Sequence, residues 1–463
     1  MASKNVIIFS DGTGQRGGVL VDERRSNIYK LFRATRCGPD SPINPAEQVG
    51  FYDPGLGTLP PGSEFFSTLW RRIYNLASQA TGLGLTGNII DCYAAIVQLY
   101  QPGDRIFLFG FSRGAYTVRC LGAVLAMCGV PTRMKDGSPL KRDEGTTKTI
   151  AREAVKSVYQ HTSSRPVVGA SPRESELLQQ RTALAARFRD QYGSDANGQS
   201  NAFPYFIGVF DTVASLANPV AILGFSVGAV AALLIVAWLA SLFLLSFTCW
   251  LAILGGLAVV AFVVGYMQTH IKVAFGLPGY SWWRTFHFTE PRMNFYDLTL
   301  NPNVGYARHA LAIDEQRKSF QRVGWGMPGT TRNTGEGNPE WFKQLWFAGD
   351  HSDIGGSYTE NESRLSDTSL KWMVDEATSI GLKVDTTILR AYPNAEGMQH
   401  DECKSGIFKY AGKIVRHVPN DAPLHPSVLA RFAIPAVLQF DEVKPYRPEA
   451  LQTHHAVAQY YPA

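Results

Sequence analysis

A long stretch without a charged residue lies in the middle of this chain and restricts its fold more than any other feature. From Thr212 to Gln268 there is no Asp, Glu, Lys or Arg, and most of the stretch is apolar. A helix needs roughly 20 apolar residues to cross a bilayer. The stretch has room for two such helices, over about 219–242 and 249–268, and we predict a transmembrane helical hairpin. Two buried helices, or a lid over a site, are the soluble alternatives.

The rest of the chain has the composition of a soluble protein with a large core. The hydrophobic fraction is 45% over 463 residues and the formal net charge is +5. This mildly basic balance favours an anionic membrane surface. Because no basic stripe with interleaved aromatic residues is present, we expect no nucleic-acid partner. The six cysteines lack metal or CxxC spacing, so we expect free thiols and no metal or other cofactor.

Short apolar runs alternate with helical patterns along the chain, which is typical of an α/β protein with a mostly parallel sheet. The first apolar run begins within a few residues of Met1, and this run is too short to be the apolar region of a cleaved signal peptide. We expect strands at 6–9, 48–52, 105–110, 203–210 and 344–347. We expect helices at 88–100, 115–127, 151–159, 175–188, 307–317 and 366–381.

A glycine-flanked serine follows one of the most apolar strands. Gly110-Phe111-Ser112-Arg113-Gly114 stands directly after the strand at 105–110 and opens the next helix. A serine hydroxyl is a poor nucleophile without a base, and a sharp strand-to-helix turn exposes it to one. We therefore predict Ser112 as a nucleophile. A surface serine in a structural turn is the alternative.

The residues that would activate this serine come later in the chain and also follow strands. Asp211 ends the strand at 203–210, and His351 follows the strand at 344–347. The order Ser, Asp, His is that of a catalytic triad in which the acid orients the histidine and the histidine accepts the serine proton. His309, placed on the helix predicted at 307–317, is a candidate supporting residue.

Other residues compete for the histidine and acid positions. His425 comes late but in a permitted order, and Asp350 and Asp353 flank His351 and are candidates to hold it or to bind a cation. Neighbouring residues on one turn rarely orient each other's rings, so we keep Asp353 only as a possible supporting residue.

Backbone N–H groups would stabilise the oxyanion of an acyl-transfer intermediate. We expect the first from Arg113 and the second from Gly12 or Thr13, which follow the first strand. Asp11 would repel an oxyanion, so two other roles are open for it. It makes structural hydrogen bonds, or it helps to hold a phosphate-bearing substrate through a divalent cation such as calcium.

Several segments together resemble a known family, the α/β-hydrolase domain of type VI secretion phospholipase effectors. The resembling segments are Phe9–Thr13, Phe109–Tyr116, Gly208–Val213, Arg308–Glu315 and His351–Gly356. The resemblance implies Ser112, Asp211 and His351 as the triad and cleavage of glycerophospholipid acyl esters as the activity. The chain departs from the secreted effectors by carrying the apolar hairpin.

The expected architecture is therefore an α/β-hydrolase-like, mostly parallel sheet with a helical cap and an inserted apolar hairpin. We divide the chain into the first half of the hydrolase core at 1–132, a polar helical cap at 133–200 and a core strand with the acid at 201–216. The transmembrane hairpin follows at 217–270, and 271–463 completes the core with the histidine.

The expected function is a serine esterase or lipase acting on lipid esters, a phospholipase A at a membrane. A secreted antibacterial phospholipase effector is one alternative, with secretion machinery and an immunity protein as partners. The other is a catalytically silent membrane scaffold or sensor, because a fold does not fix a function. We expect synthesis in the bacterial cytoplasm without a cleaved signal, followed by location at the inner membrane or delivery to a target cell. A homo-oligomer is left open.

Overall fold

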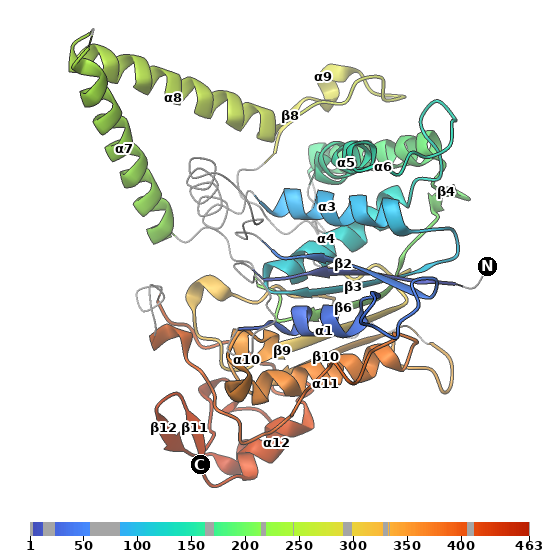
Figure 1. Cartoon of the computed structure of the whole chain (residues 1–463), viewed down its shortest axis with the longest axis vertical. Helices are drawn as coiled ribbons and strands as arrows, with labels where there is room; N and C mark the ends of the chain where they lie inside the picture. Colours follow the sequence, from blue (N-terminus) through green and yellow to red (C-terminus); the bar gives the residue numbers. More distant parts are fainter. Residues whose placement is uncertain are drawn as a thin grey trace.

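The computed structural model has a parallel sheet of six strands at its centre, in the order β10-β9-β6-β3-β1-β2 (Figure 1). It describes residues 3–12, 24–55, 84–162, 171–213, 219–243, 245–289, 299–326, 332, 334–404 and 412–462. The strands are β1 (Asn5–Ser10), β2 (Gln48–Asp53), β3 (Arg105–Phe111), β6 (Pro204–Phe210), β9 (Tyr306–Ala312) and β10 (Phe342–Phe347). All their pairings are parallel, which confirms the predicted α/β fold.

Helices cover both faces of this sheet, as the apolar strands require. On one face lie α3 (Leu85–Leu99) and α4 (Arg113–Cys128), and on the other lie α1 (Asn27–Thr35) and α11 (Arg364–Thr378) (Figure 1). The buried residues form one apolar cluster on each face. For most of these elements, the apolar residues that the sequence pattern indicated are the residues that face the core.

The polar segment predicted as a cap folds as an outer helical layer against α3 and α4 (Figure 1). It contains α5 (Glu144–Arg152), a π-helical turn (Glu153–Val158), a 3-10 turn (Tyr159–His161), α6 (Pro172–Tyr192), β4 (Asp195–Ala196) and β5 (Gln199–Ser200). Apolar residues of this layer, such as Val155 and Phe188, belong to the same cluster as α3 and α4. Ser171 starts α6 with a capping box to Glu174, which satisfies backbone N–H groups at the helix start.

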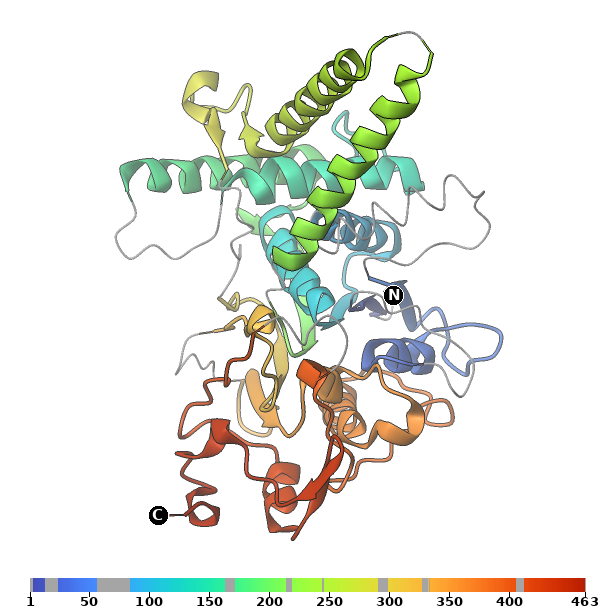
Figure 2. The ribbon, with the colours of Figure 1, turned by 90° about the vertical axis from the view of Figure 1, so that its left-hand side faces the viewer.

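Two apolar helices follow β6 and project away from the core (Figures 1 and 2). They are α7 (Pro219–Ser241) and α8 (Phe247–His270), within a few residues of the predicted bounds. Among the described residues one stretch, Phe247–Gln268, is long and apolar enough to cross a bilayer, and none of that window is buried in the protein. The corresponding stretch of α7, Ser226–Ser241, is shorter.

The chain returns to the core through short elements and ends in a small C-terminal lobe (Figure 1). The apolar cluster of this lobe also includes Leu311 of β9 and Trp346 of β10. Short elements follow α8, namely β7 (Ile271–Lys272), α9 (Trp282–Thr285) and β8 (His287–Phe288). After β10 come α10 (His351–Gly355), α11, α12 (Pro426–Ala433), β11 (Val437–Gln439) and β12 (Glu442–Lys444).

One predicted element is wrong. The helix expected at 307–317 is the strand β9, which lies between β6 and β10. Its alanines and charged residues favour a helix by local propensity, but the sheet decides the outcome. Arg308 is fully buried and pairs with Glu376 of α11 at 2.6 Å, so its charge is compensated inside the fold and does not mark a solvent-facing helix.

The order of the strands reverses between β1 and β3. The chain passes from β1 to β2 on one side and then to β3 on the other. Ligands of open α/β sheets bind where the direction reverses in this way. The loops after β1 and β3, which carry Gly12 and Ser112, lie at this position.

Candidate active site

Ser112 occupies the turn between β3 and α4 in a conformation that few side-chain-bearing residues adopt. Its φ is 58° and its ψ is −121°. Two glycines permit the turn, because a Cβ on Gly110 would overlap with the backbone of Gly114 and Ala115, and one on Gly114 with the carbonyl of Ser10. Asp211, after β6, also has a positive φ of 37°. Backbone strain of this kind clusters at functional sites.

Phe111, the residue before the serine, links the loops around it. A Cβ on Gly12 would lie 3.1 Å from the Phe111 ring and 3.5 Å from the Cβ of Ser112. On the other side, a Cβ on Gly355 would overlap with the same ring. The Phe111 ring also lies against His351, with centroids 4.6 Å apart. The serine turn, the first loop and α10 are therefore packed together by one aromatic side chain.

His351 and Asp211 are in direct contact, although they are far apart in the sequence. The His351 Nδ1 and the Asp211 Oδ2 are 2.6 Å apart and both side chains are buried. The other ring nitrogen, Nε2, is buried and has no hydrogen-bond partner among the described residues. Burial lowers the pKa of His351 below its ordinary value, against the opposing effect of Asp211. A neutral imidazole with an open Nε2 can accept a proton.

Arg416 completes the surroundings of Asp211, and the sequence offered no signal for it. Its guanidinium reaches both carboxylate oxygens, with Nη2 at 3.0 Å from Oδ2. The backbone N–H of Ala312 donates a further hydrogen bond to Oδ1 at 3.0 Å. Burial alone would raise the pKa of Asp211, but the Arg416 charge and the His351 hydrogen bond outweigh it and hold this pKa well below its usual range. Asp211 therefore stays ionised.

A second buried ion pair holds the backbone of His351. The N–H of His351 donates to the Glu315 Oε2 at 3.2 Å, and Glu315 is paired with Arg317 at 2.7 Å. Burial would raise the pKa of Glu315, but the hydrogen bond and charge of Arg317 lower it. The ring of Phe320 contacts the imidazole edge-on, with centroids 5.1 Å apart. The imidazole is thus held from several sides.

His309, expected on a helix, lies on β9 beside the acid loop. Its Nε2 accepts a hydrogen bond from the backbone N–H of Thr212 at 3.4 Å, and its Nδ1 lies 3.2 Å from the Gln344 Oε1. Burial lowers the pKa of His309 well below its ordinary value. The neutral ring thus holds the backbone of Thr212, the residue after Asp211, and His309 supports the acid loop in this way.

The structure gives Asp11 a structural role in the first loop. Its carboxylate accepts hydrogen bonds from the Ser26 hydroxyl at 2.5 Å, the Tyr52 hydroxyl at 2.7 Å and the Gly12 N–H at 2.7 Å. Burial raises the pKa of Asp11 to about 6, although these donors oppose the shift. Because the Gly12 N–H already points at this carboxylate, this conformation does not present it to an oxyanion.

The remaining oxyanion-hole residues stay predictions. Thr13 lies outside the described residues. Arg113 is the first residue of α4, and the first-turn N–H groups of a helix have no partner inside the helix. Burial lowers the pKa of the Arg113 side chain to about 10.

The acids that flank His351 are engaged in the turn itself. Asp350 caps α10, and Asp353 accepts from the Asp350 N–H at 3.1 Å. The Asp353 Oδ1 also lies 2.8 Å from the His400 Nδ1. In the part of the chain that the structure describes, no group of three or more His, Cys, Asp or Glu residues is placed to hold a metal ion. His425 caps α12 through a hydrogen bond from the Ser427 N–H at 3.2 Å.

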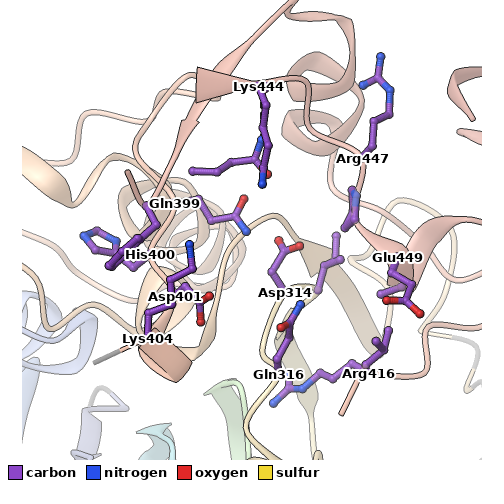
Figure 3. Close-up of a pocket in the computed structure, with 16 residues that line it drawn as sticks. Asp314, Gln316, Gln399, His400, Asp401, Lys404, Arg416, Lys444, Arg447 and Glu449 are labelled. Atoms are coloured by element: carbon purple, nitrogen blue, oxygen red, sulfur yellow. Dashed lines mark hydrogen bonds between the residues drawn. The ribbon is translucent and has the colours of Figure 1, made fainter. Parts of the chain in front are cut away.

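Two cavities lie on either side of Arg416. One, of about 250 Å³, is lined by Phe320, Arg322 and the apolar residues Ile414 and Val415. The other, of about 220 Å³, is shown in Figure 3 and lies between the C-terminal lobe and the segment that follows β9, which contributes Asp314 and Gln316. Its charged lining mixes both signs, from Lys404, Arg416, Lys444 and Arg447 to Asp314, Asp401 and Glu449. The first cavity is next to the groups that hold the histidine.

Fold and site together define the class of this protein as an α/β protein with a serine turn after β3 and a carboxylate–histidine pair after β6 and β10, at the carboxyl edge of one parallel sheet. The chain belongs to the family described as "T6SS, Phospholipase effector Tle1-like, catalytic domain", whose model matches residues 4–225 and 264–376. This confirms the resemblance found in the sequence. The residues between the two matched segments, 226–263, include most of α7 and most of α8, so the apolar helices are largely additional to the family's domain.

Individual relatives are more distant. An uncharacterised protein of Saccharomyces cerevisiae is 31% identical over 134 residues, which are 28% of this chain and 18% of that protein. A crystal structure of an uncharacterised protein from Pseudomonas aeruginosa has a TM-score of 0.37 at 17% identity, over 85% of this chain and 49% of that one. The structure of the Tle1 effector bound to the VgrG spike has a TM-score of 0.33 at 12% identity, over 85% of this chain and 77% of that one. The chain thus spans about a fifth of the yeast protein and half of the Pseudomonas protein.

Proposed function

We propose that this protein is a serine esterase that hydrolyses carboxylic esters of phospholipids at a membrane. The observation that carries the proposal is the contact between His351 and Asp211, with Nε2 of the imidazole left open beside the turn of Ser112. Membership of a phospholipase effector family supports a lipid ester as the substrate.

In the proposed reaction, the Nε2 of His351 accepts the proton of the Ser112 hydroxyl as its oxygen bonds to the carbonyl carbon of the ester. The imidazolium is stabilised by the ionised Asp211 and then gives the proton to the leaving alcohol. A water molecule attacks the acyl-enzyme by the same route, giving its proton to His351, and the proton returns to Ser112 as the fatty acid leaves. The N–H of Arg113 stabilises the oxyanion at both steps.

Helices α7 and α8 supply the membrane location in this proposal. Their apolar surfaces are exposed to the surroundings of the protein, with large side chains such as Leu223, Trp238 and Phe262 uncovered, and water is a costly environment for such a surface. As a transmembrane hairpin they would keep the catalytic edge close to its substrate and raise the local concentration.

Delivery into another cell is the second proposal, because the family is one of type VI effectors. A relative named the Tle1 effector is bound to the VgrG spike of that system, so the spike is a proposed partner, together with an immunity protein. Toxicity of the protein when it is directed to the periplasm of a susceptible cell tests this proposal.

The decisive test compares fatty-acid release from phospholipid vesicles by the wild-type protein and by Ser112→Ala, both purified in detergent. Ser379→Ala, on the exposed end of α11, is the matched control and should keep full activity. We expect Ser112→Ala to lose activity by a factor of at least about 10³. If Ser112→Ala and the wild type are equally active, Ser112 is not the nucleophile and the proposed mechanism is wrong. If both are inactive on phospholipids and simple esters, the protein is a scaffold or sensor.

A further inference from the structure

A cluster of exposed aromatic side chains follows α8 directly. Its members lie on the segment that contains β7, α9 and β8, and each is between 41% and 67% exposed: Phe275, Trp282, Trp283, Phe286 and Phe288. We call these five residues the aromatic platform. Single exposed apolar residues are ordinary on a soluble protein, but a contiguous group marks an interaction surface.

The platform forms two groups of touching rings. Trp282 lies 6.4 Å from Phe275 and 6.0 Å from Trp283, measured between ring centroids. Phe286 and Phe288 lie 5.6 Å apart. Both views of the ribbon place this segment over α6, on the same side of the molecule as α8 (Figures 1 and 2).

The backbone under the rings is fixed to α6, so the rings are held outward. Arg173 donates to the carbonyl of Arg284 at 2.7 Å and to that of Phe286 at 3.1 Å. Arg187 donates to the carbonyl of Phe275 at 2.8 Å. The polar and cationic residues of α6 thus bind the backbone of the segment and leave its aromatic side chains without a cover among the described residues.

The charge of the segment is one-sided. From Thr212 to Thr289 the chain contains no Asp or Glu, whereas Lys272 and Arg284 carry positive charge. Arg284 is 58% exposed in its side chain and forms its ion pair with Glu176 of α6. Tryptophan with neighbouring cations, at the end of an apolar helix, is the composition found at the headgroup level of a bilayer.

We propose that the aromatic platform docks into the headgroup layer of an anionic phospholipid bilayer and fixes the depth of the catalytic domain on it. The inference rests on the membrane location of α8 proposed above, because α8 ends at His270 and β7 starts at Ile271. The end of the proposed span and the platform are thus continuous. The aromatic rings sit among the lipid headgroups while Lys272 and Arg284 meet their phosphates.

The experiment measures depth and needs no catalysis. A nitroxide is attached at position 282 (Trp282→Cys) in full-length protein whose Cys37 and Cys249 are replaced by serine, and the protein is reconstituted in vesicles of phosphatidylcholine with phosphatidylglycerol. The matched control carries the label at Tyr392→Cys, which is exposed in the C-terminal half. Power saturation compares collisions of each label with oxygen and with a water-soluble nickel chelate.

We expect the ratio of oxygen to nickel collisions at position 282 to exceed that at position 392 at least threefold. The ratio should fall toward that of position 392 in pure phosphatidylcholine at high salt, because screening weakens the cationic contribution. Equal ratios at both positions in anionic vesicles would overturn the proposal. So would spin–spin broadening at position 282 that depends on protein density, since it would identify a second copy of the chain as the occupant. A protein without esterase activity can still pass this test, so its failure is separate from failure of the proposed enzyme.

Discussion

Arg416 and the proposed catalytic histidine both contact the Asp211 carboxylate, so we expect the removal of Arg416 to change the proton affinity of His351. The guanidinium Nη2 lies 3.0 Å from the Asp211 Oδ2, which lies 2.6 Å from the His351 Nδ1. Protonating His351 therefore places two positive charges roughly 5 Å apart. At an effective dielectric constant of about 20, their repulsion is about 3 kcal/mol, or on the order of two pKa units. Arg416→Met should raise the pKa of His351 by one to two such units.

The assay is the pH dependence of kcat/KM on a soluble short-chain ester, which reports the free enzyme's essential base. The acid limb should move to higher pH in Arg416→Met and stay in place in Arg416→Lys, which keeps the charge. Removing one partner of a buried ion pair also costs about 3–5 kcal/mol of stability, so folding is checked by circular dichroism. A folded Arg416→Met protein with an unmoved acid limb would refute the reasoning.

Three further predictions follow from the packing and protonation of the site. Gly355→Ala should lower activity strongly and reduce the melting temperature, because the new methyl would overlap with the Phe111 ring that positions Ser112 and His351; a variant with wild-type kcat/KM would contradict this role. Gly114→Ala should cost about 3 kcal/mol or more in urea unfolding because of its overlap with the Ser10 carbonyl, whereas Gly87→Ala, with open space in α3, should stabilise by about 0.5–1 kcal/mol. Burial raises the pKa of Asp11 from 3.8 to about 6, so its contribution to stability is greatest at acid pH and is lost as the pH rises through about 6. Between pH 4 and pH 7 the Asp11→Asn protein should therefore lose about 2 kcal/mol less stability than the wild type, and equal losses in denaturant titrations would contradict the shift.

Much of the fold follows from local patterns in the sequence. The apolar runs at β1, β3 and β6 are buried along almost their whole length, and the edge strand β10 is buried at its Trp346–Phe347 end. Buried apolar runs of this kind are distinctive in a sequence. The residues after three of these strands, Ser112, Asp211 and His351, were recognisable because parallel strands bring their carboxyl ends to one edge. The contact between His351 and Asp211 is the structural counterpart of that expectation.

Other features depend on contacts between residues that are distant in the sequence, so no local sequence pattern predicts them. The strand β9 was predicted as a helix because alanine favours helices by local propensity. The charge of its buried Arg308 is balanced by Glu376, which is distant in the sequence. Arg416 lies 205 residues beyond Asp211, in a segment without a motif. Asp11 resembled a cation ligand in the sequence, and only the fold supplies the Ser26 and Tyr52 hydroxyls that occupy its carboxylate.

Covalent labelling of Ser112 tests most directly whether this residue is an activated nucleophile. The purified protein is treated with a fluorophosphonate, which phosphonylates activated serines, and peptides are mapped by mass spectrometry. We predict one adduct on Ser112, abolished in His351→Ala while the fold is kept. An unlabelled Ser112 in folded wild-type protein, or equal labelling in the His351→Ala protein, would contradict the account.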